Sequence, residues 1–151
     1  KDIQIWIFLD NYGTYIFDSN HLNNEYFPKN EILLSDSIVS LIRKKNNTED
    51  YPKTLDSVKS SELNIFDAIK EFTERDYRIY VLNESGVDFR KELRKLNPED
   101  NILFIIGDQS GELLVNNELK KMNLTNLSLG NRSYLASSTI RLIKINLQLF
   151  V

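Results

Sequence analysis

The segment Ile102-Leu-Phe-Ile-Ile-Gly-Asp-Gln-Ser-Gly111 decides the fold, because an unbroken apolar run passes directly into a polar turn that contains two glycines. An apolar run without alternation is typical of a strand that is covered on both faces, as in a parallel sheet. Three other short runs, Ile3 to Leu9, Arg78 to Leu82 and Leu124 to Leu129, predict further strands. We expect these four runs to form one mostly parallel sheet.

Segments with apolar residues at helical spacing separate the strands. They predict helices over residues 30–45, 62–76, 87–96, 112–122 and 133–150, a short extra strand over 14–17 and a polar loop over 46–60. Strands that alternate with helices imply an α/β fold with helices on both faces of the sheet. The length of 151 residues suits a single domain over 1–151.

Composition excludes several classes of protein. The chain has no cysteine and a single histidine, His21, so we expect no metal site and no Ser-His-Asp relay. It contains no apolar run long enough to span a bilayer and no signal-peptide pattern, so we expect a cytoplasmic protein without membrane contact. Position 1 is Lys, and we expect residues before it to be missing.

Charge and the final helix bear on partners. The net charge of −3 argues against a dedicated nucleic-acid binder, although residues 43–45 and 90–95 form two basic clusters. The simplest interpretation is that these clusters are two helix ends exposed to solvent, without a binding role. The segment 133–150 carries apolar residues on more than one side, so it needs a second partner surface, most simply another subunit.

Ligands in open α/β sheets bind beyond the carboxyl ends of the strands. In this chain those ends lead into Asn83 to Gly86, Gly107 to Gly111 and Ser128 to Gly130. Glycine there permits close backbone approach to a ligand, although ordinary turns use glycine for the same freedom. Neither a P-loop nor the dinucleotide-binding glycine spacing is present. A ligand would therefore be held by backbone groups of several loops.

The order Gly107-Asp108, then Leu127-Ser-Leu-Gly130, then Ser133-Tyr-Leu-Ala-Ser-Ser-Thr-Ile140 resembles the C-terminal half of the SPOUT methyltransferases. It most resembles the archaeal tRNA (pseudouridine(54)-N1)-methyltransferases, the TrmY family. The upstream order of strands and helices is also similar, so the resemblance covers most of the chain. The N-terminal strand and helix of that family are absent here.

The resemblance implies a trefoil knot, in which the last helix threads a loop, and a homodimer that binds S-adenosyl-L-methionine and methylates tRNA. The matching cofactor-binding positions are Leu82, Asn83, Gly107, Asp108, Ser128, Leu129, Gly130, Tyr134 and Leu135. Leucine side chains would enclose the adenine, with Leu135 beneath it.

Methylation at N1 of pseudouridine requires loss of the N1 proton, which a carboxylate or a water chain could accept. Asp108 is the nearest carboxylate by motif, and the alternative is that it caps the following turn. Arg132 could meet an RNA phosphate, and the alternative is a solvated side chain.

Two other functions stay open at this point. Gln109 stands where the family usually has histidine, which favours a non-catalytic knot domain used for dimerisation or RNA binding. The third interpretation is a doubly wound nucleotide-binding domain without a knot. A measurement of methyl transfer distinguishes the methyltransferase from the non-catalytic knot domain. The path of the chain from Leu124 to Phe150 shows whether a knot is present and so decides the third interpretation.

Overall fold

The computed structural model describes residues 2–22, 28, 30–45, 57–97, 99–108, 110–130, 132 and 134–150. The chain divides into two compact units, Lys1–Ile65 and Phe66–Val151. Gln109, Ser133 and residues 46–56 of the expected loop lie outside the described residues. Among the helices that the structure describes, none has the length and apolar character needed to cross a membrane.

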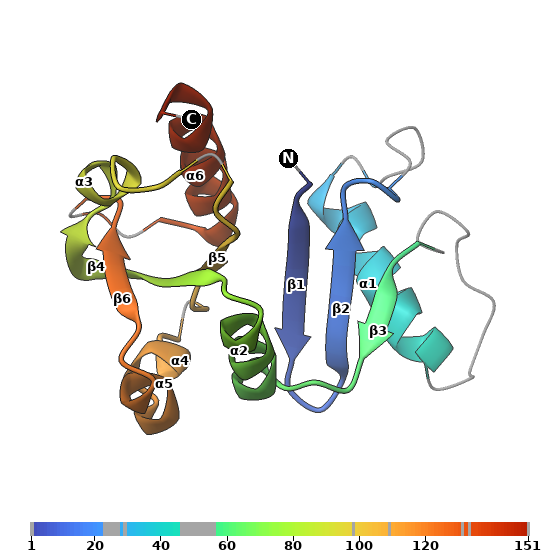
Figure 1. Ribbon diagram of the computed structural model, residues 1–151. Coiled ribbons are helices and arrows are strands. Elements are labelled where there is room, and N and C mark those ends of the chain that lie inside the picture. The colour runs from blue at the N-terminus through green and yellow to red at the C-terminus, as the bar shows by residue number, and fades with distance from the viewer. Residues whose placement is uncertain are drawn as a thin grey trace. The chain divides into compact units, whose positions relative to one another are not determined.

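The N-terminal unit contains β1 (Gln4–Leu9), β2 (Gly13–Asp18), α1 (Glu31–Lys45) and β3 (Lys59–Ser61), as Figure 1 shows. Its strands form an antiparallel sheet in the order β1-β2-β3. The turn after β1 is closed by the Tyr12 N–H, which donates to the Leu9 carbonyl at 3.0 Å. Asn11 and Gly13 adopt positive φ values of 64° and 92° in this turn.

This hairpin corrects the expectation that the first apolar run joins the other three in one parallel sheet. A parallel connection needs a crossover of a dozen or more residues, whereas a turn this short can join only antiparallel neighbours. The short strand β3 was also missed, because the polar stretch that precedes it predicts a loop. The core of the unit is built from Tyr15, Phe17 and Leu41, so α1 packs against the sheet.

The C-terminal unit contains the parallel sheet. Its elements are α2 (Ile65–Glu74), β4 (Arg78–Asp88), α3 (Phe89–Leu93), β5 (Ile102–Ile105), α4 (Glu112–Val115), α5 (Asn117–Lys121), β6 (Thr125–Ser128) and α6 (Ala136–Phe150). The strand order is β5-β4-β6, and both pairings are parallel. The predicted α/β class and parallel sheet are therefore confirmed.

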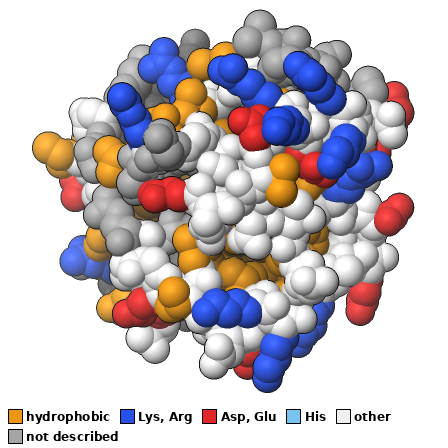
Figure 2. Space-filling view, turned by 90° about the vertical axis from the view of Figure 1, so that its left-hand side faces the viewer, with side chains coloured by type: hydrophobic (Ala, Val, Ile, Leu, Met, Phe, Trp, Pro, Cys, Tyr) orange, Lys and Arg blue, Asp and Glu red, His pale blue; other side chains and the backbone are white. Residues whose placement is uncertain are grey.

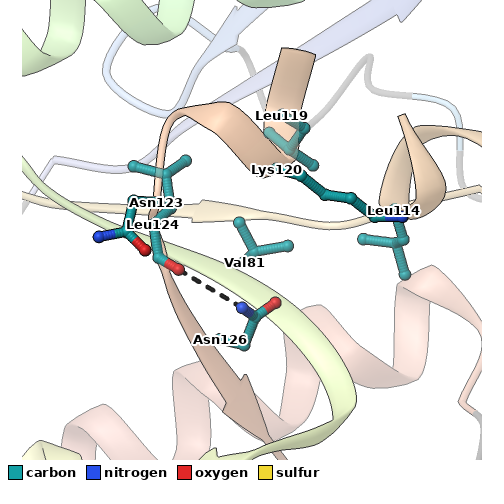
Figure 3. A pocket seen from close by; sticks show the side chains of 7 residues that line it. All are labelled: Val81, Leu114, Leu119, Lys120, Asn123, Leu124 and Asn126. Atoms are coloured by element: carbon teal, nitrogen blue, oxygen red, sulfur yellow. Dashed lines mark hydrogen bonds between the residues drawn. The ribbon is translucent and has the colours of Figure 1, made fainter. Parts of the chain in front are cut away.

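Helices cover both faces of this sheet. On one face, the core formed by Tyr80, Leu82 and Leu127 packs against α3 and α6 through side chains that include Phe89 and Ile143. Residues alternate along a strand, so Val81 points to the other face. There it lines a small cavity together with Leu119 of α5 (Figure 3).

Burial of Tyr80 in the sheet raises the pKa of its phenol, and the nearby Glu92 carboxylate adds to the effect.

All five predicted helices are shorter or divided in the structure. The helix expected over 87–96 spans only Phe89–Leu93, because Val87 and Asp88 pair with β6 as the end of β4. The helix expected over 112–122 is divided at Asn116, which is extended (φ −62°, ψ 131°) and caps α5 by accepting the Glu118 N–H at 2.7 Å. An asparagine side chain competes with helical backbone bonds, which favours a cap here. The last helix begins at Ala136, not at residue 133. Its passage through a loop stays a prediction.

Leu93 offers a test of the α3 contact with the sheet. This side chain is only 3% exposed and belongs to the main core cluster. Leu93→Ala is expected to lower the free energy of unfolding by about 2–5 kcal/mol, since removal of buried methyl groups leaves a cavity. Urea denaturation measures the change, with Val115→Ala as the control because Val115 is 65% exposed. Equal stability of the two variants would contradict the packing.

Candidate functional site

The carboxyl ends of the parallel strands surround a cavity of about 220 Å³. Its lining comes from the middle of β4, where the strand leaves the ladder, and from the loop after β5, the α4 turn, and β6 with the segment that follows it into α6. The lining residues are Leu82, Asn83, Glu84, Ile106, Gly107, Asp108, Leu114, Leu127, Leu129, Gly130, Arg132, Tyr134 and Thr139. This is the place where open α/β sheets bind ligands.

The first wall of the cavity is an excursion in β4. Leu82 and Val87 both pair with Leu127 of β6, so the residues between them loop out of the ladder. The Asn83 side-chain oxygen accepts the Ser85 N–H at 3.0 Å and the Ser85 hydroxyl at 2.9 Å, which holds the turn. The strand therefore returns to its neighbour after presenting Asn83 and Glu84 to the cavity.

Gly86 lets the excursion close against β6. A Cβ atom added at this position would lie 2.6 Å from the Asn126 carbonyl carbon and 2.6 Å from the Leu127 nitrogen. Both are backbone atoms, and carbon atoms in ordinary contact lie about 3.5–4.0 Å apart. The glycine is therefore required for close approach of two backbones, not for an unusual φ angle.

The second wall is the loop after β5. The Asp108 carboxylate accepts a hydrogen bond from the Ser110 hydroxyl at 2.8 Å and from the Gly111 N–H at 3.1 Å. Ser110 Oγ in turn accepts the Glu112 N–H at 3.1 Å, at the start of α4. Gly111 has a φ of 72°, a conformation that glycine adopts without steric cost. Asp108 thus has the capping role that was the alternative for this residue.

The third wall follows β6. The Ser128 hydroxyl accepts the Gly130 N–H at 3.1 Å and lies 3.0 Å from the Gly130 carbonyl oxygen, to which it donates. Gly130 adopts a φ of 123° and lines the cavity. Ser128 therefore shapes this loop from outside the cavity lining.

Most of the residues singled out in the sequence meet at this cavity. Those that line it are Leu82, Asn83, Gly107, Asp108, Leu129, Gly130, Arg132 and Tyr134. Ser128 is adjacent, and Leu135 is 60% exposed and is not among the lining residues. Their roles in binding and catalysis stay predictions.

Five lining residues were missed. Glu84 lies within the strand end Asn83 to Gly86 that the sequence indicated, although it was not singled out as a binding residue, and Ile106 directly precedes Gly107. Leu127 is a strand residue whose side chain reaches the cavity. Leu114 and Thr139 lie on helices, and their presence depends on how α4 and α6 pack against the sheet. No local sequence signal identifies them.

The residues that line the cavity are of two kinds, apolar and polar. Leucine and isoleucine side chains supply an apolar wall, whereas Asn83, Glu84, Asp108 and Arg132 supply polar and charged groups. Apolar walls with a few placed polar groups are the usual design of a small-molecule site. Within the described ranges, no group of three or more His, Asp or Glu side chains could hold a metal ion.

Asp108 offers a test of the loop that forms the second wall. Asp108→Ala is expected to lower the free energy of unfolding by about 0.5–2 kcal/mol, because the Ser110 hydroxyl and the Gly111 N–H lose the carboxylate as their acceptor and the Gly111 N–H keeps only the longer bond to the Asp108 carbonyl at 3.3 Å. Asp108→Asn keeps an acceptor oxygen and should retain most of the stability. Urea denaturation of both variants measures the difference, and equal losses in both would show that the cap contributes nothing.

Comparison with solved structures places the fold. The chain is similar to the crystal structure of Archaeoglobus fulgidus Nep1 bound to S-adenosylhomocysteine, with a TM-score of 0.60 and 17% sequence identity. The match covers 97% of this chain and 62% of the Nep1 chain. The likeness shows an α/β fold with a parallel sheet and helices, shared with the Nep1 structure. No protein-family model and no curated protein matches the sequence.

Proposed function

We propose that this chain is an S-adenosyl-L-methionine-dependent RNA methyltransferase domain. The observation that carries the proposal is the cavity at the ends of β4, β5 and β6, lined by residues of the Gly-Asp and Ser-Leu-Gly motifs. The fold likeness to Nep1 supports it, because that structure holds S-adenosylhomocysteine, the product left when the cofactor loses its methyl group.

The residues present fit such a cofactor. Adenine is a flat and largely apolar ring, and Leu82, Ile106 and Leu129 supply apolar surface. The amino-acid end carries both charges, which Glu84 and Arg132 of the lining can complement. When bound, S-adenosylmethionine supplies an electrophilic methyl group.

For methyl transfer, the side chains of the site must also orient the nucleotide and accept the proton that its N1 atom loses. A well-placed nucleophile gains most of its rate from orientation, and a carboxylate within hydrogen-bond reach can take the proton. Asp108 and Glu84 are the carboxylates of the lining. Asp108 is the proposed proton acceptor by motif, although its hydrogen bonds to Ser110 and Gly111 also give it a structural task.

The surface of the C-terminal unit supports RNA as the substrate. Arg90 and Lys91 are exposed on α3 and Arg94 is exposed directly after it, and within the described part of the chain none of them forms an ion pair. Lys and Arg side chains gather on the upper part of the face that carries α3 (Figure 2). Arg132 adds a cation in the cavity lining. Phosphate contacts of this kind fix the register of a nucleic acid.

The finer substrate assignment is tRNA, with methylation at N1 of pseudouridine in the T-loop, and it rests on the resemblance to the TrmY family. We also propose a single domain in the cytoplasm that works as a homodimer. Exposed Ile140 and Ile145 on α6 support the dimer, because a helix whose other side is buried through Ile143 then still presents apolar surface.

The test is transfer of a labelled methyl group from S-adenosylmethionine to tRNA. We expect label in tRNA that carries pseudouridine in the T-loop and none in the same transcript with uridine. Label in pseudouridine-containing ribosomal RNA but not in tRNA would overturn the tRNA assignment and keep the methyltransferase. Binding of S-adenosylhomocysteine without any transfer would favour the non-catalytic knot module, which the capping role of Asp108 supports.

A further inference from the structure

A second cavity adjoins the site cavity in the C-terminal unit. It has a volume of about 140 Å³ and is lined by Val81, Leu114, Leu119, Lys120, Asn123, Leu124 and Asn126 (Figure 3). Among the residues that line the two cavities, Leu114 alone belongs to both. Its side chain therefore stands at the boundary between them.

Leu114 is held in place by few contacts. It lies on α4, a single turn in which no residue is buried. Its own side chain is only partly buried. The turn begins at Gly111, whose carbonyl accepts the Leu114 N–H at 3.1 Å. A one-turn helix without buried residues contributes little to the core, so a smaller residue at 114 is compatible with folding.

Gly107 lies close to the Leu114 side chain. A Cβ atom at Gly107 would lie 3.1 Å from Leu114 Cγ and 3.4 Å from its Cδ1. The absence of a side chain at Gly107 thus lets the leucine side chain approach the loop that follows β5. Leu114 belongs with the apolar part of the lining, whereas Glu84, Asp108 and Arg132 form the charged part.

We propose that Leu114 is a partition that determines the size of ligand the site accepts on the side of the second cavity. The proposal rests on the proposed function, in which the adenine of S-adenosylmethionine takes the apolar part of the lining. Truncation of Leu114 would join the two cavities. The enlarged site would accept an adenosyl compound with an apolar group on the adenine amino nitrogen. Val81, Leu119 and Leu124 would supply apolar surroundings for this group, and Lys120, Asn123 and Asn126 complete the lining.

The experiment measures calorimetric affinities of parent and Leu114→Ala for three probes. These are S-adenosylhomocysteine, its N6-benzyl derivative, and a derivative enlarged by an acyl group on the homocysteine nitrogen. We expect Leu114→Ala to improve the affinity for the N6-benzyl probe at least tenfold relative to S-adenosylhomocysteine, with no such gain for the acyl probe. Val115→Ala on the same turn is the matched control, because Val115 is 65% exposed and lines neither cavity.

The outcomes separate the two proposals. If the parent binds S-adenosylhomocysteine and the N6-benzyl ratio does not change in Leu114→Ala, the partition is wrong and the proposed function stands. A gain for the acyl probe alone would also overturn the assignment of the adenine to this end. If the parent binds no S-adenosylhomocysteine, the proposed function fails and the size role of Leu114 fails with it.

A double-mutant cycle of Gly107→Ala and Leu114→Ala, measured without ligand, tests the contact between residues 107 and 114. Gly107→Ala should destabilise the parent, because the new methyl group presses on Leu114, and should destabilise Leu114→Ala much less. Residues in contact show such non-additive effects, whereas distant residues do not. Additive effects on the free energy of unfolding would show that Leu114 does not occupy the boundary.

Discussion

Gly86→Ala is expected to abolish the cooperative unfolding transition of the C-terminal unit or to lower its free energy of unfolding by more than about 3 kcal/mol, beyond the usual range for overpacking. The added Cβ would lie 2.6 Å from backbone atoms of Asn126 and Leu127. Neither atom can move away without separating β4 from β6, which pair on both sides of the Asn83–Gly86 excursion. Urea denaturation followed by circular dichroism measures the loss.

Gly111→Ala is the matched control for this prediction. A Cβ at Gly111 meets nothing within 4 Å, so the substitution costs only the strain of its φ of 72°, about 1–2 kcal/mol. A Gly86→Ala variant that is no less stable than Gly111→Ala would show that the β4 and β6 backbones are not in close approach.

Gly107→Val is expected to weaken the binding of S-adenosylhomocysteine at least tenfold, which corresponds to about 1.4 kcal/mol. The first added carbon already lies 3.1 Å from Leu114 Cγ, and Gly107 lines the proposed cofactor cavity. The branched side chain therefore either enters the cavity or displaces one of its walls. Calorimetric titration measures the affinity, and Val115→Ala should bind like the parent. Equal affinity of Gly107→Val and the parent would place the cofactor elsewhere.

Local signals in the sequence were sufficient for the parallel sheet. Apolar runs that end in Asn83, in Gly107-Asp108 and in Ser128 to Gly130 predicted the three strands and the edge at which their loops meet. Because the carboxyl ends of parallel strands share one edge, this rule accounts for six of the thirteen residues that line the cavity.

The remainder depends on packing between distant segments. The reason for Gly86 is a contact with β6, about forty residues away in the chain, and a sequence pattern does not report that distance. Leu114 and Thr139 line the cavity only because α4 and α6, which lie far from β4 in the chain, bring them to it. The first apolar run looked like a parallel strand because apolarity alone does not reveal pairing direction, which the turn at Asn11 and Gly13 decides.

The central claim is that an adenosyl cofactor binds at the edge where β4, β5 and β6 end, and an amide NMR titration with S-adenosylhomocysteine tests it most directly. The chain has only five glycines, so their amide signals are readily followed. We predict saturable shifts of the Gly107 and Gly130 amides, which belong to two different walls of the cavity. Saturable binding that leaves both of these signals unmoved would contradict the assignment of the site.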